Sequence, residues 1–425
     1  MMKKVICLII ILASLFLVSC GEAPITPTGT AGETSANTPI EEPKHTIVPV
    51  THSLYHAAIE APSRVLLAQG GGLWYYSKVD GESYRFCFNP LCQHTFAEKC
   101  PSQFFWHAGA TRNEITFSES ENRFYFLRGQ NVYSTSFDAS DLKLVCSLGS
   151  DGGPDQPAYN QRVFALTNIS YYDGYVYFCY TNDMSGRNQI IRCLIKTGKV
   201  EQMTPDDEWV IAYEIADGYI YFKTIDEDNV VTYYTTDMDF KERRIVSDPI
   251  DPTPGGLHMG IYDGKYFYKK YGDELYALNP RTDEKKLIAK DEEYIKGAQI
   301  VCVYQGEVYF ILHNPVVIGT HYVEPYGEMS VSTTQNNVWK VTTDGEIIRV
   351  LDFPRGNIRS VNFIEDGVIV NFTTIFDKEF SADNDEYTSG AFVYFDIDEN
   401  GNFVNPKPIG NHAENEDLIK FLKGV

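Results

Sequence analysis

A short hairpin motif recurs along the chain and constrains the fold more than any other feature. Its clearest copy, residues 217–222, reads Asp-Gly-Tyr-Ile-Tyr-Phe. Asp-Gly tolerates the positive φ angles of a type I′ turn, and the alternating aromatic residues after it are typical of a half-buried strand. The seven loose copies are residues 71–76, 121–126, 173–178, 217–222, 263–268, 305–310 and 366–371.

The spacing of the copies indicates a repeat architecture. Counted at the second residue of each copy, the shortest step runs from 264 to 306, 42 residues, and the longest from 306 to 367, 61 residues. Strand-rich units at this period are typical of propeller blades. One strand precedes most copies and two follow, so we name the strands A to D from the centre outward. The sequence therefore predicts an all-β protein, a seven-bladed β-propeller of four-stranded antiparallel blades over residues 51–425.

Length and charge restrict the function. A chain of 425 residues is long for one compact core, but a propeller avoids this limit because each blade packs only on its neighbours. Lys and Arg number 36 against 58 Asp and Glu, a net charge of −22. Such a surface repels polyanions, so we expect no nucleic acid partner and no direct binding to an anionic membrane.

The N-terminus has the pattern of an export signal. Lys3 and Lys4 precede an apolar run over residues 5–18, too short for a stable membrane span. The run ends in Leu-Val-Ser-Cys-Gly at residues 17–21, which resembles the lipobox of bacterial lipoproteins. This resemblance implies a lipoprotein signal peptide over residues 1–19, with Cys20 becoming the lipidated first residue. The protein is then extracytoplasmic and anchored to a bacterial membrane by its N-terminal lipid.

The stretch that follows predicts a tether. Residues 20–50 are rich in Pro and Thr and show no apolar periodicity. A segment of this composition cannot bury enough apolar surface to fold, and its prolines keep it extended. We therefore expect residues 20–50 to be a disordered linker between the lipid and the propeller.

One compact group of side chains has the composition of a metal site. Cys87, Cys92, His94 and Cys100 place three thiols and an imidazole within 14 residues. Such a set can hold one structural zinc with tetrahedral geometry, although the spacing is not a standard finger pattern. One disulfide with a spare thiol is the alternative for an exported chain. The cluster falls where we expect strand D of the first blade, so the loop is predicted to replace that strand.

Further cysteines lie singly in predicted strands. Cys146 and Cys302 fit the pattern of buried free thiols. Cys179 and Cys193 fall on neighbouring strands B and C of one blade, a placement that permits a cross-strand disulfide without requiring one.

Two long insertions mark a candidate ligand site. They occupy the B–C connections of the last two blades, at residues 313–336 and 376–387. Long connections inside a compact fold are often functional, and these two belong to neighbouring blades. Their aromatic and carboxylate side chains suit a sugar or a cationic peptide. The predicted ligand-binding residues are His321, Tyr322, Glu324, Tyr326, Phe376, Asp377, Phe380 and Tyr387.

The repeat also resembles a known group of proteins. Asp-Gly-x-Ile/Val-Tyr-Phe, followed by Leu-Tyr-x-Leu and a polar turn, is similar to bacterial lipoproteins with a β-propeller like that of low-density-lipoprotein-receptor-related proteins, a domain of unknown function. The resemblance covers roughly residues 60–400. Receptor-type propellers have Tyr-Trp-Thr-Asp where this chain has Tyr-Phe or Phe-Tyr. The resemblance implies the fold and export but no activity.

These observations favour a binding module that presents a propeller face to an extracellular glycan, peptide or protein ligand. Two alternatives stay open, because the fold hosts many functions. One is an enzyme acting on extracellular glycan or peptide through a carboxylate pair on the propeller face. The other is a structural scaffold for partner proteins. The sequence predicts no particular catalytic residue and no cofactor other than the zinc.

Overall fold

The computed structural model describes residues 58–423, apart from a set of gaps. The gaps are residues 62, 70–71, 88, 90, 95–99, 101, 103–114, 119, 129–130, 148–168, 182–186, 217, 247–260, 264, 313–315, 324–326, 334–336, 354–355 and 376–387. The chain divides into the units Met1–Lys44 and His45–Val425, and all described residues belong to the second. The predicted signal peptide, Cys20 and tether lie outside the described residues.

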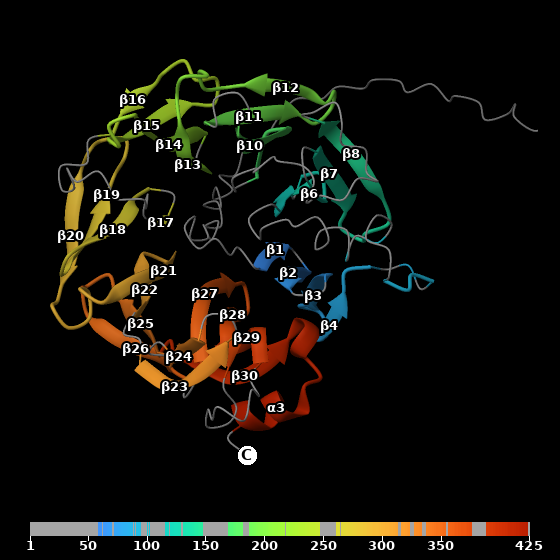
Figure 1. The fold of residues 1–425 in the computed structure, drawn as a ribbon, viewed down its shortest axis with the longest axis vertical. Helices are drawn as coiled ribbons and strands as arrows, with labels where there is room; N and C mark the ends of the chain where they lie inside the picture. The colour runs from blue at the N-terminus through green and yellow to red at the C-terminus, as the bar shows by residue number, and fades with distance from the viewer. Residues whose placement is uncertain are drawn as a thin grey trace, which may run out of the picture. The chain divides into compact units, whose positions relative to one another are not determined.

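Seven four-stranded antiparallel sheets form the ring of a β-propeller, as predicted (Figure 1). We number these blades in chain order. In every blade the strands pair in the order in which they occur in the chain, so each blade is an antiparallel meander. Figure 1 shows the first strand of a blade nearest the centre and the fourth at the rim, for example β17 and β20.

The first four blades contain sixteen of the strands. Blade 1 comprises β1 (Ala58–Ala61), β2 (Arg64–Gln69), β3 (Gly72–Ser77) and β4 (Ser83–Arg85). Blade 2 comprises β5 (Ile115–Ser118), β6 (Arg123–Arg128), β7 (Asn131–Ser136) and β8 (Leu142–Ser147). Blade 3 comprises β9 (Ser170–Tyr172), β10 (Tyr175–Thr181), β11 (Asn188–Leu194) and β12 (Lys199–Gln202). Blade 4 comprises β13 (Val210–Ala216), β14 (Tyr219–Ile225), β15 (Val231–Asp237) and β16 (Arg244–Ile245).

The last three blades carry the described helices and one additional hairpin. Blade 5 comprises β17 (Ile261–Tyr262), β18 (Phe267–Tyr271), β19 (Glu274–Leu278) and β20 (Lys285–Lys290). Blade 6 comprises β21 (Ala298–Tyr304), β22 (Glu307–Leu312), β25 (Asn337–Val341) and β26 (Ile347–Asp352), with β23 (Val316–Val323) and β24 (Gly327–Thr333) inserted. Blade 7 comprises β27 (Gly356–Ile364), β28 (Gly367–Ile375), β29 (Thr388–Ile397) and β30 (Phe403–Ile409). The 3₁₀ helix η2 (Gly410–His412) and the helix α3 (Glu416–Leu422) follow.

The hairpin turns have the backbone that the sequence predicts. Asp173 and Gly174 have φ angles of 44° and 76°, and Gln305 and Gly306 have 52° and 78°. Positive φ at both central positions is the requirement of a type I′ turn. These two turns join the first and second strands of their blades, as expected.

The first predicted copy does not mark the turn between strands A and B of its blade. Gly72 is the first residue of β3, so this copy falls where strand B gives way to strand C, whereas in the other six blades the copy falls between strands A and B. β1 ends at Ala61 and β2 begins at Arg64, and the sequence between them, Pro-Ser, lacks the Asp-Gly signal. Gly72 serves another purpose, because a Cβ there would lie 2.5 Å from the carbonyl oxygen of Ser102. The glycine allows the backbone at Ser102 to approach closely. In the sequence, a glycine needed for such a contact looks the same as a glycine needed for a turn.

The apolar core lies between neighbouring blades rather than at one centre. One cluster joins blades 3 and 4 through Tyr177, Ile190, Tyr213 and Phe222, all at most 1% exposed. Comparable clusters join the other neighbouring blades, and the largest spans blades 5 to 7. Alternating aromatic residues in strands A to C supply both faces of each blade with apolar side chains, as a stack of sheets requires.

The ring closes through side chains between blades 1 and 7. Val65 and Leu67 of blade 1 pack with Ile369 and Ile409 of blade 7. Each of these two blades is built from consecutive strands, so no described strand is shared across the closure. Lys78, whose side chain is 7% exposed, adds ion pairs to Glu60 at 2.8 Å and to Glu365 at 3.4 Å.

Among the described residues, no helix has the length and apolar character that a membrane crossing requires.

Candidate metal centre and blade-six arm

The cysteine cluster lies in the connection from blade 1 to blade 2. Strand D of blade 1 is present as β4, three residues long, and Cys87 follows it two positions later. The prediction that the cluster replaces this strand is therefore wrong. The short strand leaves enough chain after it for a separate loop, and the alternating pattern of only three residues was too brief to recognise.

Local turns fold the chain back so that the first two cysteines face each other. The side-chain oxygen of Asn89 accepts a hydrogen bond from the backbone N–H of Leu91 at 3.0 Å. The backbone N–H of Cys92 donates to the carbonyl oxygen of Asn89, also at 3.0 Å. His94 then adopts a left-handed conformation, with φ 55°, which reverses the chain again. Asn is well suited to the first turn because its side chain imitates a backbone acceptor.

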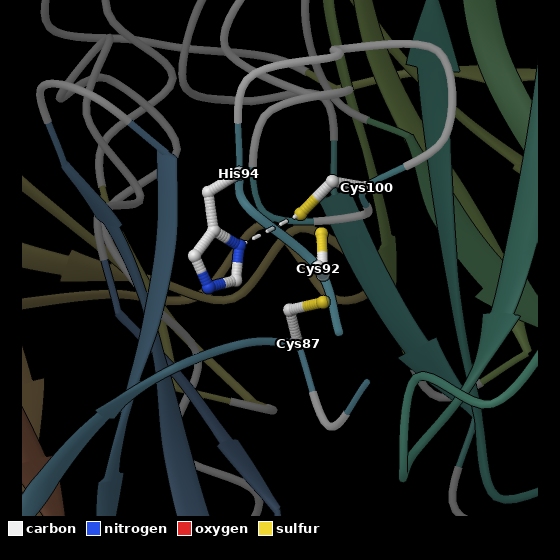
Figure 2. A group of neighbouring side chains, drawn as sticks. All are labelled: Cys87, Cys92, His94 and Cys100. Carbon is white, nitrogen blue, oxygen red and sulfur yellow. Dashed lines mark hydrogen bonds between the residues drawn. The ribbon is translucent and has the colours of Figure 1, made fainter. Parts of the chain in front are cut away.

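The four side chains converge as a metal site requires. One donor atom from each of Cys87, Cys92, His94 and Cys100 lies within 4.8 Å of all the others. Figure 2 shows the three sulfur atoms and the imidazole ring turned toward one another. A tetrahedral zinc with Zn–S bonds of about 2.3 Å separates its sulfur ligands by roughly 3.8 Å. The donors therefore need to move inward by about 1 Å at most to hold zinc.

Burial, hydrogen bonding and nearby charge shift the pKa values of the donor groups in different directions. Burial raises the pKa of Cys87. Burial also opposes ionisation of Cys92, but hydrogen bonds to its sulfur from the His94 backbone N–H and the thiols of Cys100 and Cys87 lower its pKa overall. Burial and the nearby Arg85 lower the pKa of His94, so the imidazole is neutral near pH 7. A neutral imidazole is the form that binds metal.

Two donors already touch. Nδ1 of His94 lies 3.2 Å from Sγ of Cys100, and Cys100 is fully buried. Cys87, Cys92 and Cys100 are all free thiols in the structure. The site thus has one buried anchor, Cys100, and three partly exposed donors through which a metal ion can enter.

The cross-strand pairing suggested for Cys179 and Cys193 is wrong. In the ladder between β10 and β11, Cys179 lies opposite Ile190 and Cys193 opposite Val176. The two cysteines are offset by an odd number of positions, so they face opposite sides of the sheet. Cys193 packs toward blade 2 and Cys179 toward blade 4.

The predicted loop of blade 6 is a β-hairpin, which we call the arm (Val316–Thr333). β23 pairs only with β24 among the described strands. β22 pairs directly with β25, so the arm is not part of the four-stranded sheet of blade 6. Tyr322 lies opposite Glu328, and Thr320 lies opposite Ser330. All four side chains are exposed and share one face of the hairpin because strand side chains alternate.

The other predicted ligand-binding residues divide into two groups. His321 lies in β23 opposite Met329. Glu324 and Tyr326 of the arm, and the whole blade-seven set, lie outside the described residues: Phe376, Asp377, Phe380 and Tyr387. Thr320 and Ser330 were not predicted. A strand assignment with period two, counted from Tyr322 and Glu328, would have identified them.

Comparisons with known proteins identify the fold alone. Neither a scan against protein-family models nor a search of curated proteins finds a match. A puromycin hydrolase structure has a TM-score of 0.50 and 10% identity, covering 85% of this chain and 53% of its own. The chain thus spans about half the length of that enzyme. An oligogalacturonate lyase from Vibrio parahaemolyticus has a TM-score of 0.51 and 9% identity, covering 84% of this chain and 92% of its own.

A third structural match has a lower score. The chain matched in a nidogen–laminin complex has a TM-score of 0.30 and 10% identity, over 67% of this chain and 92% of its own. At such values the similarity carries no argument for or against the receptor-type resemblance. The protein is a seven-bladed β-propeller with a candidate metal centre in the first inter-blade connection and a projecting arm on the sixth blade.

Proposed function

We propose that the protein is an extracytoplasmic binding module, tied to a bacterial membrane by lipid on Cys20, and that the arm contacts its ligand. The ligand class we favour is a basic, extended peptide segment of a partner protein. An isolated two-stranded hairpin is at best marginally stable in water. Of the arm residues whose burial the structure describes, Val317, Thr320, Tyr322, Glu328 and Ser330 are exposed and Gly319 and Gly327 are half-buried.

That exposure is the observation that carries the proposal. Ordering the arm costs backbone entropy on the order of 1 kcal/mol per residue, and the ladder between β23 and β24 offsets part of this cost. An exposed face on a hairpin outside the four-stranded sheet of its blade is available for contact with another molecule. The arm also offers strand edges that no described strand of the ring occupies, and a peptide can add to such an edge through backbone hydrogen bonds.

The chemistry of the arm face selects a basic ligand. Tyr322, 65% exposed, offers an aromatic ring to a Lys or Arg side chain, and Glu328 opposite it supplies a carboxylate. Thr320 and Ser330 add hydroxyl groups on the same face. The net charge of −22 attracts cationic partners over longer distances and repels anionic ones.

We further propose that Cys87, Cys92, His94 and Cys100 bind one structural zinc. The donors surround a common point, and the segment that bears them also packs on blade 1, where Ser102 approaches Gly72. Zinc would therefore hold the connection between blades 1 and 2 in place against blade 1. Structural sites of this kind contribute directly to folding free energy.

The experiment that tests the binding proposal is an array of basic peptides and oligosaccharides probed with residues 45–425. A variant in which an Asn-Gly turn replaces the arm is probed in parallel. We expect basic peptides to bind the wild type, and the variant to keep its melting temperature while losing at least tenfold in affinity. Equal binding by both proteins would contradict the proposal. Binding confined to oligosaccharides would replace the ligand class, and cleavage of array members would favour the enzyme alternative.

A further inference from the structure

Two cysteines from different blades meet at the interface of blades 2 and 3. Cys146 lies in β8, the rim strand of blade 2, and Cys193 lies in β11 of blade 3. Cys146 is 6% exposed and Cys193 is fully buried. Both belong to one apolar cluster, together with Val132 of blade 2 and Val176 of blade 3.

The two thiols of this cluster affect each other's ionisation. The thiol of Cys146 donates a hydrogen bond to the sulfur of Cys193, which raises the pKa of Cys146 and lowers that of Cys193. Cys146 is the one buried side chain of β8, whose other residues are exposed or half-buried. Cys146 is thus the residue of β8 that is buried in the cluster between blades 2 and 3, and the half-buried Val145 packs against the same cluster.

The backbones around the pair also approach closely. Gly198, in the turn after β11, has φ +69°, and a Cβ there would lie 2.8 Å from the carbonyl oxygen of Val145. The same Cβ position is 3.9 Å from the Cβ of Cys146. Only glycine fits this contact, so β8 is held against blade 3 independently of the two sulfur atoms. A disulfide needs two backbones that approach closely, and this contact brings the turn after β11 against the strand that carries Cys146.

We propose that Cys146 and Cys193 form a disulfide that cross-links blades 2 and 3 when the chain folds in the presence of an organic disulfide. Both are free thiols in the structure. The thiolate of Cys193 attacks the oxidant RSSR, forms a mixed disulfide and releases one RSH. The thiolate of Cys146 then attacks the sulfur of Cys193 and releases the second RSH. The two protein thiols lose two protons and two electrons in total, and the oxidant gains them.

Burial decides when the reaction takes place. An oxidant cannot reach two side chains that are at most 6% exposed in the packed ring. The oxidant must therefore react with Cys193 before blade 3 packs on blade 2. Packing then brings Cys146 to the mixed disulfide, and the completed cross-link is protected from reductants. The extracytoplasmic location proposed above supplies an oxidant of this class in the cell, because disulfides form in exported proteins. The geometry itself does not depend on that location.

One experiment in two parts tests the disulfide and the extracytoplasmic location separately. The full chain, extracted in detergent and reduced, is refolded with reduced and oxidised glutathione and zinc, alkylated and digested without reductant. We expect a peptide containing residues 142–147 joined to one containing residues 188–194. Recovery of Cys146 and Cys193 as alkylated thiols, or of Cys193 joined to Cys179, overturns the proposal.

In the second part of the experiment, free thiols are alkylated in intact cells before lysis. The same joined peptides are expected there. If the joined peptides form in refolding but are absent from cells, the disulfide geometry is supported and the extracytoplasmic location is contradicted. Failure of the disulfide proposal is therefore distinguishable from failure of the location proposal. In protein refolded with glutathione we expect C146S and C193S to lower the melting temperature by about 5 °C relative to wild type. When all three proteins are refolded in dithiothreitol instead, so that no disulfide forms, their melting temperatures should match. C179S should leave the cross-link intact.

Discussion

Tyr76 in blade 1 stacks on Tyr394 in blade 7, with ring centroids 5.3 Å apart and an interplanar angle of 27°. The hydroxyl of Tyr394 also donates a hydrogen bond to the carbonyl oxygen of Asp366 at 2.8 Å. The first and last blades share no described strand, so this stack and its apolar neighbours hold the ring closed. The closure therefore depends on side-chain packing between the two ends of the propeller.

Replacing Tyr394 with Ala should open this contact. We expect Y394A to lower the free energy of unfolding by about 2–4 kcal/mol, through lost burial and the lost aromatic pair. Urea denaturation measures the change. The matched control is Y322A on the arm, an exposed tyrosine whose loss should cost below about 1 kcal/mol. Equal destabilisation by the two variants would show that the stack does not close the ring.

Zinc content tests the cluster. We expect wild-type protein purified without chelator to contain about one zinc per chain, and C92S and H94A to contain almost none. C179S, which changes a buried cysteine outside the cluster, should retain the metal. Loss of zinc should also accompany acidification, because protons compete with metal for the thiolates. Elemental analysis that finds no metal in the wild type rules the site out.

Lys223 should make stability depend on pH. Burial, and then the nearby charge of Lys269, lower the pKa of Lys223 to about 7 from its usual 10.5. Between these two values only the unfolded chain holds the proton, so stability rises as pH increases from about 7 toward 10. Below pH 7 the folded state must carry the buried charge, at a cost on the order of 4 kcal/mol.

K223M should remove that dependence. We expect the difference in melting temperature between K223M and wild type to be largest at pH 6 and to shrink toward pH 10. K143M, at a side chain that is 63% exposed, serves as the control and should follow the wild-type profile. A difference between K223M and wild type that stays constant from pH 6 to pH 10 would argue against a depressed pKa.

The lipid anchor depends on one residue. Cys20→Ala should leave the protein unprocessed or release it from membranes, because the lipid joins the cysteine that follows the cut. Membrane fractionation and gel mobility report both effects. Wild-type behaviour of C20A in the two assays would exclude lipidation at this position.

The sequence predicted the repeat better than its exact placement. Turns such as Asp173-Gly174 are local, so Asp-Gly between alternating strands revealed them. Gly72 misled the assignment because its role is a long-range contact with Ser102, which no local pattern records. Blade number survived that error because blade 1 still contains four strands.

The sites show the same division between local and long-range information. Cys87, Cys92, His94 and Cys100 are close in sequence, and their convergence was predicted. Cys146 and Cys193 come from different blades, so their meeting required the packing of one blade on another. Tyr322 was selected for its chemistry, but the hairpin that places it opposite Glu328 was taken for a loop.

The measurement that tests the binding account most directly compares two variants that each remove one negative charge. Glu328 lies on the arm face, and Glu399 is an exposed carboxylate in the turn between β29 and β30. Affinity for a basic peptide selected from the array is measured by isothermal titration with E328Q and E399Q. The account predicts about a tenfold loss for E328Q and less than a twofold loss for E399Q, because a direct charge pair contributes about 1.4 kcal/mol or more. Equal losses for the two variants would contradict it, since the peptide would then respond to overall charge rather than to the arm.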